Sequence, residues 1–121
     1  MINNETHNPL GRHLLIEFWG AKTIESIEKW EKLLWNAAKA AKSTPLKAAI
    51  HKFEPQGVTG FVILEESHIS FHTWPEKKYI VIDIFTCGQH TDPQAGMEYL
   101  AKELSPKKIV SQLIIRGQEE K

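Results

Sequence analysis

Groups capable of nucleophilic and acid–base chemistry gather in one stretch of the chain, residues 64–87, which reads LEESHISFHTWPEKKYIVIDIFTC. It holds a Glu66-Ser67 bond, two histidines four residues apart (His68 and His72), and Cys87, the single cysteine. A serine hydroxyl in a strained turn can attack the preceding carbonyl carbon, so that an ester replaces the amide. If a base then removes the α proton, β-elimination leaves dehydroalanine, which hydrolyses to a pyruvoyl group. The stretch therefore has the residue types of a chain that cuts itself.

A pyruvoyl ketone would give the new N-terminus the chemistry of an electron sink. It forms a Schiff base with a substrate amine and stabilises the carbanion left by the loss of carbon dioxide. In this scheme His72 is a candidate for the base that drives cleavage, and Cys87 could return a proton to the carbanion. The hypothesis is thus a decarboxylase whose cofactor derives from Ser67.

Composition limits the other classes of function. The chain has 121 residues, which suits a single domain, and its 15 Lys+Arg balance 15 Asp+Glu. This neutrality does not favour nucleic acid or an anionic membrane as a partner. One cysteine excludes an internal disulfide and, without a spaced set of further ligands, makes a structural metal site improbable. No apolar run approaches the roughly 20 residues of a membrane span, and no signal peptide is recognisable, so we expect a cytoplasmic protein.

Two helices and six strands are predicted from periodicity. Apolar residues recur every three or four positions from 24 to 41, which indicates an amphipathic helix of about five turns. Thr23 and Ser26 are its N-cap candidates, and Pro45 follows its end. A second helix should begin at Asp92-Pro93, since aspartate is a good N-cap and proline fits the first helical position. The strands are expected at about 11–19, 46–53, 58–64, 67–74, 79–85 and 108–115.

The fourth of these strands carries both histidines of the chemical stretch. Its residues alternate in a period of two, which places His68 and His72 on the same face. The order of elements is strand-helix-strand, a hairpin, then strand-helix-strand. It predicts an α+β fold, a two-layer sandwich of a mainly antiparallel sheet of about six strands with both helices on one face.

Four blocks of sequence resemble a known family. GRHLLIEFWG, HKFEPQGVTG, ESHISFHTWPE and DIFTCG are similar to the small bacterial and archaeal form of S-adenosylmethionine decarboxylase, the self-processing pyruvoyl proenzymes of polyamine synthesis. The resemblance covers about residues 10–115 with compatible spacing. The pairing of ESHxxxHTWPE with DxFTCG is highly specific for this family.

The resemblance implies a role for several residues. Glu66-Ser67 would be the scissile bond, and Ser67 would become the pyruvoyl group. His72 would be the processing base and Cys87 the catalytic proton donor. Phe53 would stack on the adenine of the substrate. The expected reaction is the decarboxylation of S-adenosylmethionine for spermidine biosynthesis, catalysed by chains cut into 1–66 and 67–121 that pair as a homodimer with sites at or near the interface.

One position departs from the family. Thr59 stands where the family usually has a serine that assists processing. Threonine keeps the hydroxyl but restricts its rotamer, which predicts slower or partial maturation. Two alternatives follow: a pyruvoyl-dependent arginine or ornithine decarboxylase with the same maturation, and an unprocessed paralogue that only binds a partner subunit.

Three further residues have more than one interpretation. His68 neighbours the cleavage site in sequence, but it could be structural or serve only to position the turn. His13 and Glu17 lie on alternate residues of the first strand. They could contact the substrate or a partner subunit, or simply form a satisfied strand face.

Overall fold

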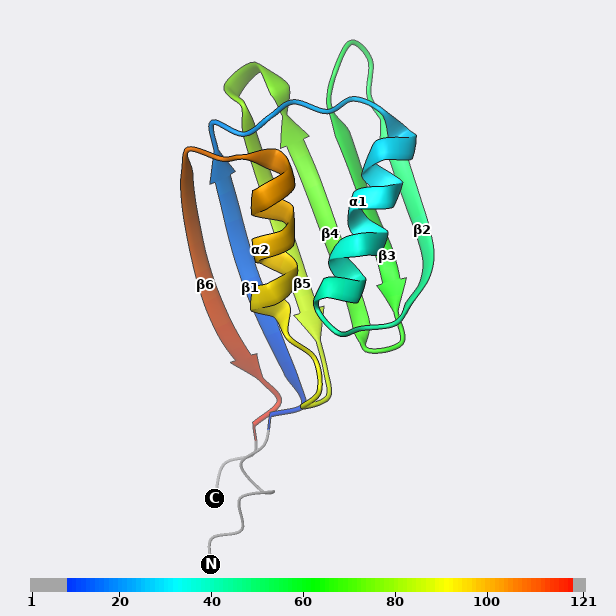
Figure 1. Cartoon of the computed structure of the whole chain (residues 1–121), viewed down its shortest axis with the longest axis vertical. Helices are drawn as coiled ribbons and strands as arrows, with labels where there is room; N and C mark the ends of the chain where they lie inside the picture. Colours follow the sequence, from blue (N-terminus) through cyan, green and yellow to red (C-terminus); the bar gives the residue numbers. More distant parts are fainter. Residues whose placement is uncertain (1–8, 119–121) are drawn as a thin grey trace, which may run out of the picture.

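The computed structural model describes residues 9–118 and shows one six-stranded sheet covered by two helices (Figure 1). The strand order is β2-β3-β4-β5-β1-β6, and all five neighbouring pairs are antiparallel. In chain order the elements are β1 (Gly11–Trp19), α1 (Ile27–Ala40), β2 (Pro45–Lys52), β3 (Val58–Leu64), β4 (Ser67–Trp74), a 3-10 turn (Pro75–Lys77), β5 (Tyr79–Thr86), α2 (Pro93–Leu104) and β6 (Lys108–Arg116).

Both helices lie on the same face of the sheet, as predicted for an α+β sandwich (Figure 1). α1 packs over β2 and β3, and α2 over β1 and β5. The core between the layers is made of large apolar side chains that are less than 2 % exposed, among them Trp30, Phe18, Leu34, Ile82 and Leu100. The ring of Trp30 stacks on Phe71 of β4 with centroids 3.8 Å apart, which fixes α1 against the centre of the sheet.

α1 is shorter than its sequence pattern indicated. It has 14 residues, about four turns, and begins after Ser26, whose hydroxyl accepts the Lys29 amide at 3.1 Å. Thr23 is therefore not the N-cap. Residues 21–26 are not helical, and the Ile24 carbonyl in this segment accepts the indole N–H of Trp30 at 2.8 Å. α2 begins at Pro93 as expected, with Asp92 accepting the Ala95 amide at 3.1 Å.

The strand boundaries agree with the predicted ones to within one residue, and β3 and β4 agree at both ends. In β4, Ile69, Phe71 and Thr73 point into the core, whereas His68 and His72 lie on the opposite face with intermediate exposure. The prediction that both histidines share a face is therefore confirmed.

The face of the sheet that carries no helix is rich in apolar and aromatic side chains, and we call it the open face. Strand alternation and the cross-strand register assign to it one residue in two of every strand. Its exposed large side chains are Trp19, Phe61, Ile63, Trp74, Val110 and Ile114, each 36 to 42 % exposed. Between residues 9 and 118, neither helix has the length and apolar character to cross a bilayer.

Candidate active site

The Glu66-Ser67 bond lies in the tight connection between β3 and β4. Leu64 pairs with Ser67 across the hairpin, which leaves Glu65 and Glu66 as a two-residue turn. Two-residue hairpin turns usually have glycine or asparagine at the positions that need a positive φ. Neither residue of this turn is a glycine or an asparagine. Ser67 instead takes a φ of 137°, a conformation that costs a non-glycine residue on the order of 1–3 kcal/mol. The strain that the chemical hypothesis required is thus located on the serine itself.

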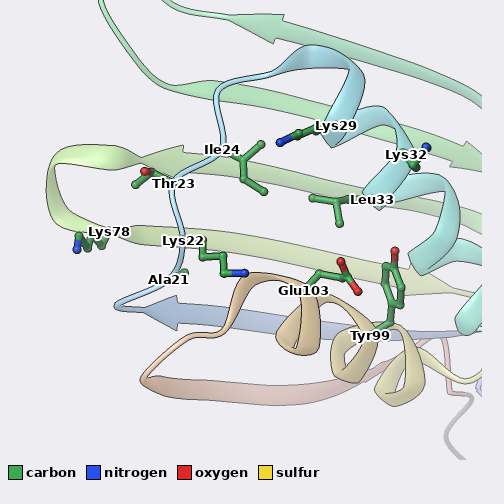
Figure 2. Close-up of a pocket in the computed structure, with 10 residues that line it drawn as sticks. All are labelled: Ala21, Lys22, Thr23, Ile24, Lys29, Lys32, Leu33, Lys78, Tyr99 and Glu103. Carbon is green, nitrogen blue, oxygen red and sulfur yellow. The ribbon is translucent and has the colours of Figure 1, made fainter.

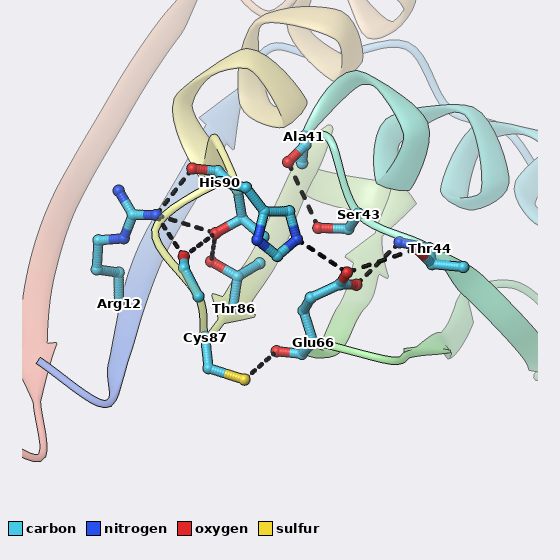
Figure 3. Close-up of polar contacts among 10 residues, drawn as sticks. Arg12, Ala41, Ser43, Thr44, Glu66, Thr86, Cys87 and His90 are labelled. Carbon is cyan, nitrogen blue, oxygen red and sulfur yellow. Dashed lines mark hydrogen bonds and ion pairs between the residues drawn. The ribbon is translucent and has the colours of Figure 1, made fainter.

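Two donors from Cys87 converge on the carbonyl oxygen of Glu66. The Cys87 backbone N–H donates to this oxygen at 2.8 Å, and the Cys87 Sγ donates to it at 3.1 Å (Figure 3). Cys87 immediately follows β5, which pairs with β4 so that Ser67 lies opposite Thr86. The register of the sheet therefore brings Cys87 to the carbonyl group that would be attacked. The thiol is exposed, as a group that meets a substrate must be.

His68 is the histidine that touches the serine. Its Nδ1 lies 3.2 Å from the Ser67 Oγ, within hydrogen-bond distance. This contact is compatible with both interpretations of His68, a structural role and the positioning of the turn, and it adds the ability to orient the serine hydroxyl.

The side chain of Glu66 is itself held by two segments. The Thr44 amide donates to its Oε1 at 2.9 Å, and the His90 Nε2 lies 3.1 Å from its Oε2 (Figure 3). The hydrogen bond from the Thr44 amide lowers the pKa of the Glu66 carboxyl; burial acts in the opposite direction, and the hydrogen bond with His90 adds to the lowering. Glu66 is therefore an ionised carboxylate that is only 11 % exposed.

Arg12 of β1 fixes the loop that carries Cys87 and His90. Its Nη2 donates to the Gly88 carbonyl at 3.0 Å and to the Thr91 carbonyl at 2.8 Å. The same nitrogen lies 2.9 Å from the Thr91 hydroxyl, which donates in turn to Thr86 at 3.0 Å. The loop is thus tied to two strands of the sheet (Figure 3).

Three other residues singled out from the sequence lie together at a different place on the open face. Thr59 and His72 are direct partners in the β3–β4 register, and the ring of Phe53 is 5.8 Å from that of His72. Thr59 and His72 line a cavity of about 540 Å³ together with His51, Phe61 and Asp83. The Thr59 hydroxyl donates to the Phe71 carbonyl at 3.0 Å. Phe53 is 38 % exposed and is not a core residue.

Within one chain, His72 does not reach Ser67. The two residues are five positions apart in β4, so their Cα atoms are separated by roughly 16 Å of strand. The chain therefore divides the expected site residues into two groups. We call Glu66, Ser67 and Cys87 the cleavage group, and Phe53, Thr59 and His72 the acceptor group.

His13 and Glu17 both lie on the open face and both have partners. The His13 Nε2 lies 3.0 Å from the Asp83 Oδ1, and the Glu17 Oε1 accepts the indole N–H of Trp19 at 3.1 Å. Burial raises the pKa of Tyr79, and the neighbouring Glu17 carboxylate raises it further. Glu17 thus places negative charge beside the aromatic side chains of this face.

A larger cavity lies away from both groups. Figure 2 shows this space of about 680 Å³ on the helix side of the sheet, where it is lined by Lys22, Lys29, Lys32 and Lys78 together with Tyr99 and Glu103. Four ammonium groups are poorly suited to a sulfonium cation such as S-adenosylmethionine. The charge of this cavity therefore does not favour such a substrate.

Arg12, Thr44 and His90 were not singled out from the sequence. His90 lies three residues after Cys87 in the run TCGQHT, which was the available signal. Nothing in the sequence marks Thr44, because its shorter contact with Glu66 uses the backbone amide, which every residue except proline has.

Comparison with known proteins identifies the family of this chain. The family model described as S-adenosylmethionine decarboxylase matches residues 12–117. An S-adenosylmethionine decarboxylase proenzyme of Methanococcus maripaludis is 44% identical over 110 residues, covering 89% of this chain and 90% of the relative. One from Caldanaerobacter subterraneus subsp. tengcongensis is 40% identical over 116 residues, covering 94% of each chain.

A solved structure gives the same result for the fold. The crystal structure of the adenosylmethionine decarboxylase from Aquifex aeolicus superposes with a TM-score of 0.85 at 37% identity, covering 93% of this chain and 95% of that one. The chain belongs to the S-adenosylmethionine decarboxylase family.

Proposed function

We propose that this chain is a proenzyme that cuts itself between Glu66 and Ser67 and then decarboxylates S-adenosylmethionine for spermidine biosynthesis. The observation that carries the proposal is the pair of Cys87 donors, 2.8 and 3.1 Å from the Glu66 carbonyl oxygen, beside a serine at a φ of 137°. The relatives named as proenzymes of this activity support the substrate.

The first step of cleavage is an attack by the Ser67 hydroxyl on the Glu66 carbonyl carbon. An electron pair moves onto the Glu66 oxygen, where the Cys87 N–H and thiol stabilise the developing negative charge as an oxyanion hole does. The C–N bond then breaks, and the nitrogen of Ser67 takes the proton that the hydroxyl has lost. Glu66 is left as an ester on the serine oxygen, and the conformational strain at Ser67 is released.

The second step needs a base at the α carbon of Ser67. Removal of this proton breaks the bond between Cβ and Oγ, so that Glu66 leaves as a carboxylate and a dehydroalanine remains. Addition of water and loss of ammonia convert it into the pyruvoyl ketone at the head of 67–121. His68 is close enough to hold the hydroxyl in the first step, and we assign the base of the second step to His72.

His72 can act only if it comes from a second copy, because its own Ser67 is roughly 16 Å away along β4. The open face, with its six exposed large apolar side chains, is the surface suited to a second copy, since monomers rarely expose such patches. In a twofold dimer each contact occurs twice. Two open faces stacked in this way would bring the cleavage group of each copy to the acceptor group of the other.

In the mature enzyme the pyruvoyl ketone supplies the electron sink that amino-acid decarboxylation requires. The residues of the chain provide binding and a proton. Phe53 offers an exposed ring for the adenine, and the carboxylates of Asp83 and Glu17 on the open face favour a cationic substrate. The thiol of Cys87 is placed to protonate the carbon that has lost carbon dioxide.

The two cut chains would stay together. Residues 1–66 contribute β1, β2 and β3 and residues 67–121 contribute β4, β5 and β6, and β1 of the first fragment lies between β5 and β6 of the second. No strand would have to move for the enzyme to mature.

The comparisons favour S-adenosylmethionine over arginine or ornithine, because the matching relatives are named for the former. An exposed Phe53 agrees with this choice, since the side chain of a simple amino acid has no ring to stack on it. An unprocessed paralogue is disfavoured because the matching relatives are named as proenzymes of this decarboxylase.

The proposal is tested by the mass of the denatured protein followed by a substrate assay. We expect two fragments broken between Glu66 and Ser67, the second blocked to N-terminal sequencing and reactive as a ketone. The cut protein should release carbon dioxide from carboxyl-labelled S-adenosylmethionine. Agmatine or putrescine formation without this release would establish the alternative substrates, and a chain that stays intact would refute self-cleavage.

A further inference from the structure

Three segments distant in sequence meet at the side chain of Glu66. They are the segment just before β2, the β3–β4 turn and the loop after β5 (Figure 3). The Thr44 amide donates to Oε1 at 2.9 Å, and the Thr44 hydroxyl donates to Oε2 at 3.5 Å. The third partner is His90, with Nε2 at 3.1 Å from Oε2. Each oxygen of a carboxylate that is only 11 % exposed is thereby fixed.

The loop that supplies His90 also holds the other end of the same residue. Cys87 donates to the Glu66 carbonyl oxygen, while His90 holds the Glu66 carboxylate. With both ends fixed, the carbonyl group cannot rotate away from the Cys87 donors. Such fixation is what a reaction of neighbouring groups needs, because its rate depends on the fraction of time spent in the attack geometry.

We propose that His90 is a positioning residue for self-cleavage: together with Thr44 it clamps the Glu66 carboxylate and so presents the scissile carbonyl to Ser67 and to the donors of Cys87. This inference rests on the self-cleavage proposed above. His90 makes and breaks no covalent bond in it.

The position of the His90 ring is determined by the loop. Gly88 has a φ of +93°, and a Cβ built on it would lie 2.8 Å from the His90 Cε1 and 3.0 Å from its Nδ1. Only glycine leaves room for the ring there. Arg12 holds the same loop through the Gly88 and Thr91 carbonyls. The imidazole thus occupies space that a glycine at position 88 leaves free, and its Nε2 contacts the Glu66 carboxylate.

The exposure of His90 separates a positioning role from a structural one. Its side chain is 60 % exposed, and without it the Glu66 carboxylate keeps both of its contacts with Thr44. Replacement of His90 should therefore leave the folded state nearly as stable as before. The rate of cleavage should nevertheless fall, because the carboxylate would keep only the Thr44 contacts and the residue before the scissile bond could rotate.

The experiment measures the rate at which freshly made proenzyme separates into two fragments on denaturing mass spectra. We expect His90→Ala to cleave about tenfold more slowly than the unchanged chain, which corresponds to about 1.4 kcal/mol of activation free energy. His90→Gln keeps a side-chain N–H donor and should recover most of the rate. Gln89→Ala, in the same exposed loop, is the matched control and should cleave normally.

Two further measurements separate the possible causes. Thermal unfolding is compared between Ser67→Ala and Ser67→Ala/His90→Ala, neither of which can cut, and we expect equal midpoints. Turnover per pyruvoyl group in His90→Ala that has been left to cleave fully should match that of the unchanged enzyme.

Several results would overturn the inference. Cleavage of His90→Ala at the unchanged rate would show that the clamp does not matter. A large loss of thermal stability in the double variant, or a His90→Gln variant as slow as His90→Ala, would reduce His90 to a structural contact. If the unchanged chain never cleaves, the proposed function is wrong and so is this inference. If the unchanged chain and His90→Ala both cleave at the same rate, only the role of His90 is refuted.

Discussion

Mixing two inactive variants tests whether each site is shared between two copies. Ser67→Ala removes the nucleophile of the cleavage group, and His72→Ala removes the base from the acceptor group, so neither homodimer should mature. In a mixed dimer, the Ser67 of the His72→Ala chain meets the intact His72 of the Ser67→Ala chain. This pairing restores one complete site, whereas the second site of the same dimer lacks both groups.

The expected yield follows from the geometry. Random pairing of equal amounts makes about half of the dimers mixed, and one site of two in each is complete, so about a quarter of all chains should cleave. Every cleaved chain must carry His72→Ala. A site made within one chain predicts no cleavage at all in this mixture, because neither variant chain carries both Ser67 and His72.

The assay is co-expression of the two variants with different tags, followed by denaturing mass spectrometry of the fragments. The fragment 67–121 that appears should have the mass of the alanine variant at position 72. An absence of cleavage in mixed dimers shown to have formed would refute the shared site. Normal cleavage in the His72→Ala homodimer would refute His72 as the base and transfer that role to His68, which lies 3.2 Å from the Ser67 hydroxyl.

Three further predictions concern single residues. Cys87→Ala keeps the backbone donor to the Glu66 carbonyl and loses only the weaker thiol donor, so cleavage should slow by about tenfold. Turnover per pyruvoyl group should fall further. Normal turnover would show that the thiol takes no part in the mechanism. Phe53→Ala should raise KM for S-adenosylmethionine by about tenfold, as the loss of one base-stacking contact does, with kcat nearly kept; an unchanged KM would place the adenine elsewhere. The pKa of Glu66 is lowered in the folded state, chiefly by the Thr44 amide, so its contribution to stability is present above the ordinary glutamate pKa and lost as pH falls through the lowered one. Urea unfolding of Ser67→Ala across this range should therefore lose stability with acid more steeply than that of Ser67→Ala/Glu66→Gln, and parallel curves would contradict the assignment.

The helices and strands could be predicted from the sequence because the signals for them are local. β3 and β4 are bounded by turns and by changes of polarity, and both were placed at their observed ends. The start of α1 was less certain because Thr23 and Ser26 are both good caps, and the choice depended on Trp30, whose indole N–H donates to the Ile24 carbonyl and keeps that turn extended.

The candidate site was only partly predictable, because its parts lie on different strands. Periodicity put His68 and His72 on one face, but it could not show that only His68 contacts Ser67. The contact between Cys87 and the Glu66 carbonyl depends on the β4–β5 register. The roles of Arg12 and His90 depend on partners more than 20 residues away in sequence, which no local pattern reveals.

If the chain cleaves as proposed, the insertion of β1 between β5 and β6 has a thermodynamic consequence. Before cleavage, unfolding is a one-chain equilibrium, and a two-residue turn keeps β3 next to β4. After cleavage, unfolding releases two chains, so the equilibrium obeys mass action and each tenfold dilution lowers stability by about 1.4 kcal/mol. Refolding then requires the fragments to find each other and to place β1 between β5 and β6. The chain would therefore have to fold before it cleaves. A cleaved molecule that unfolds in dilute solution would not readily refold, because its two fragments would separate.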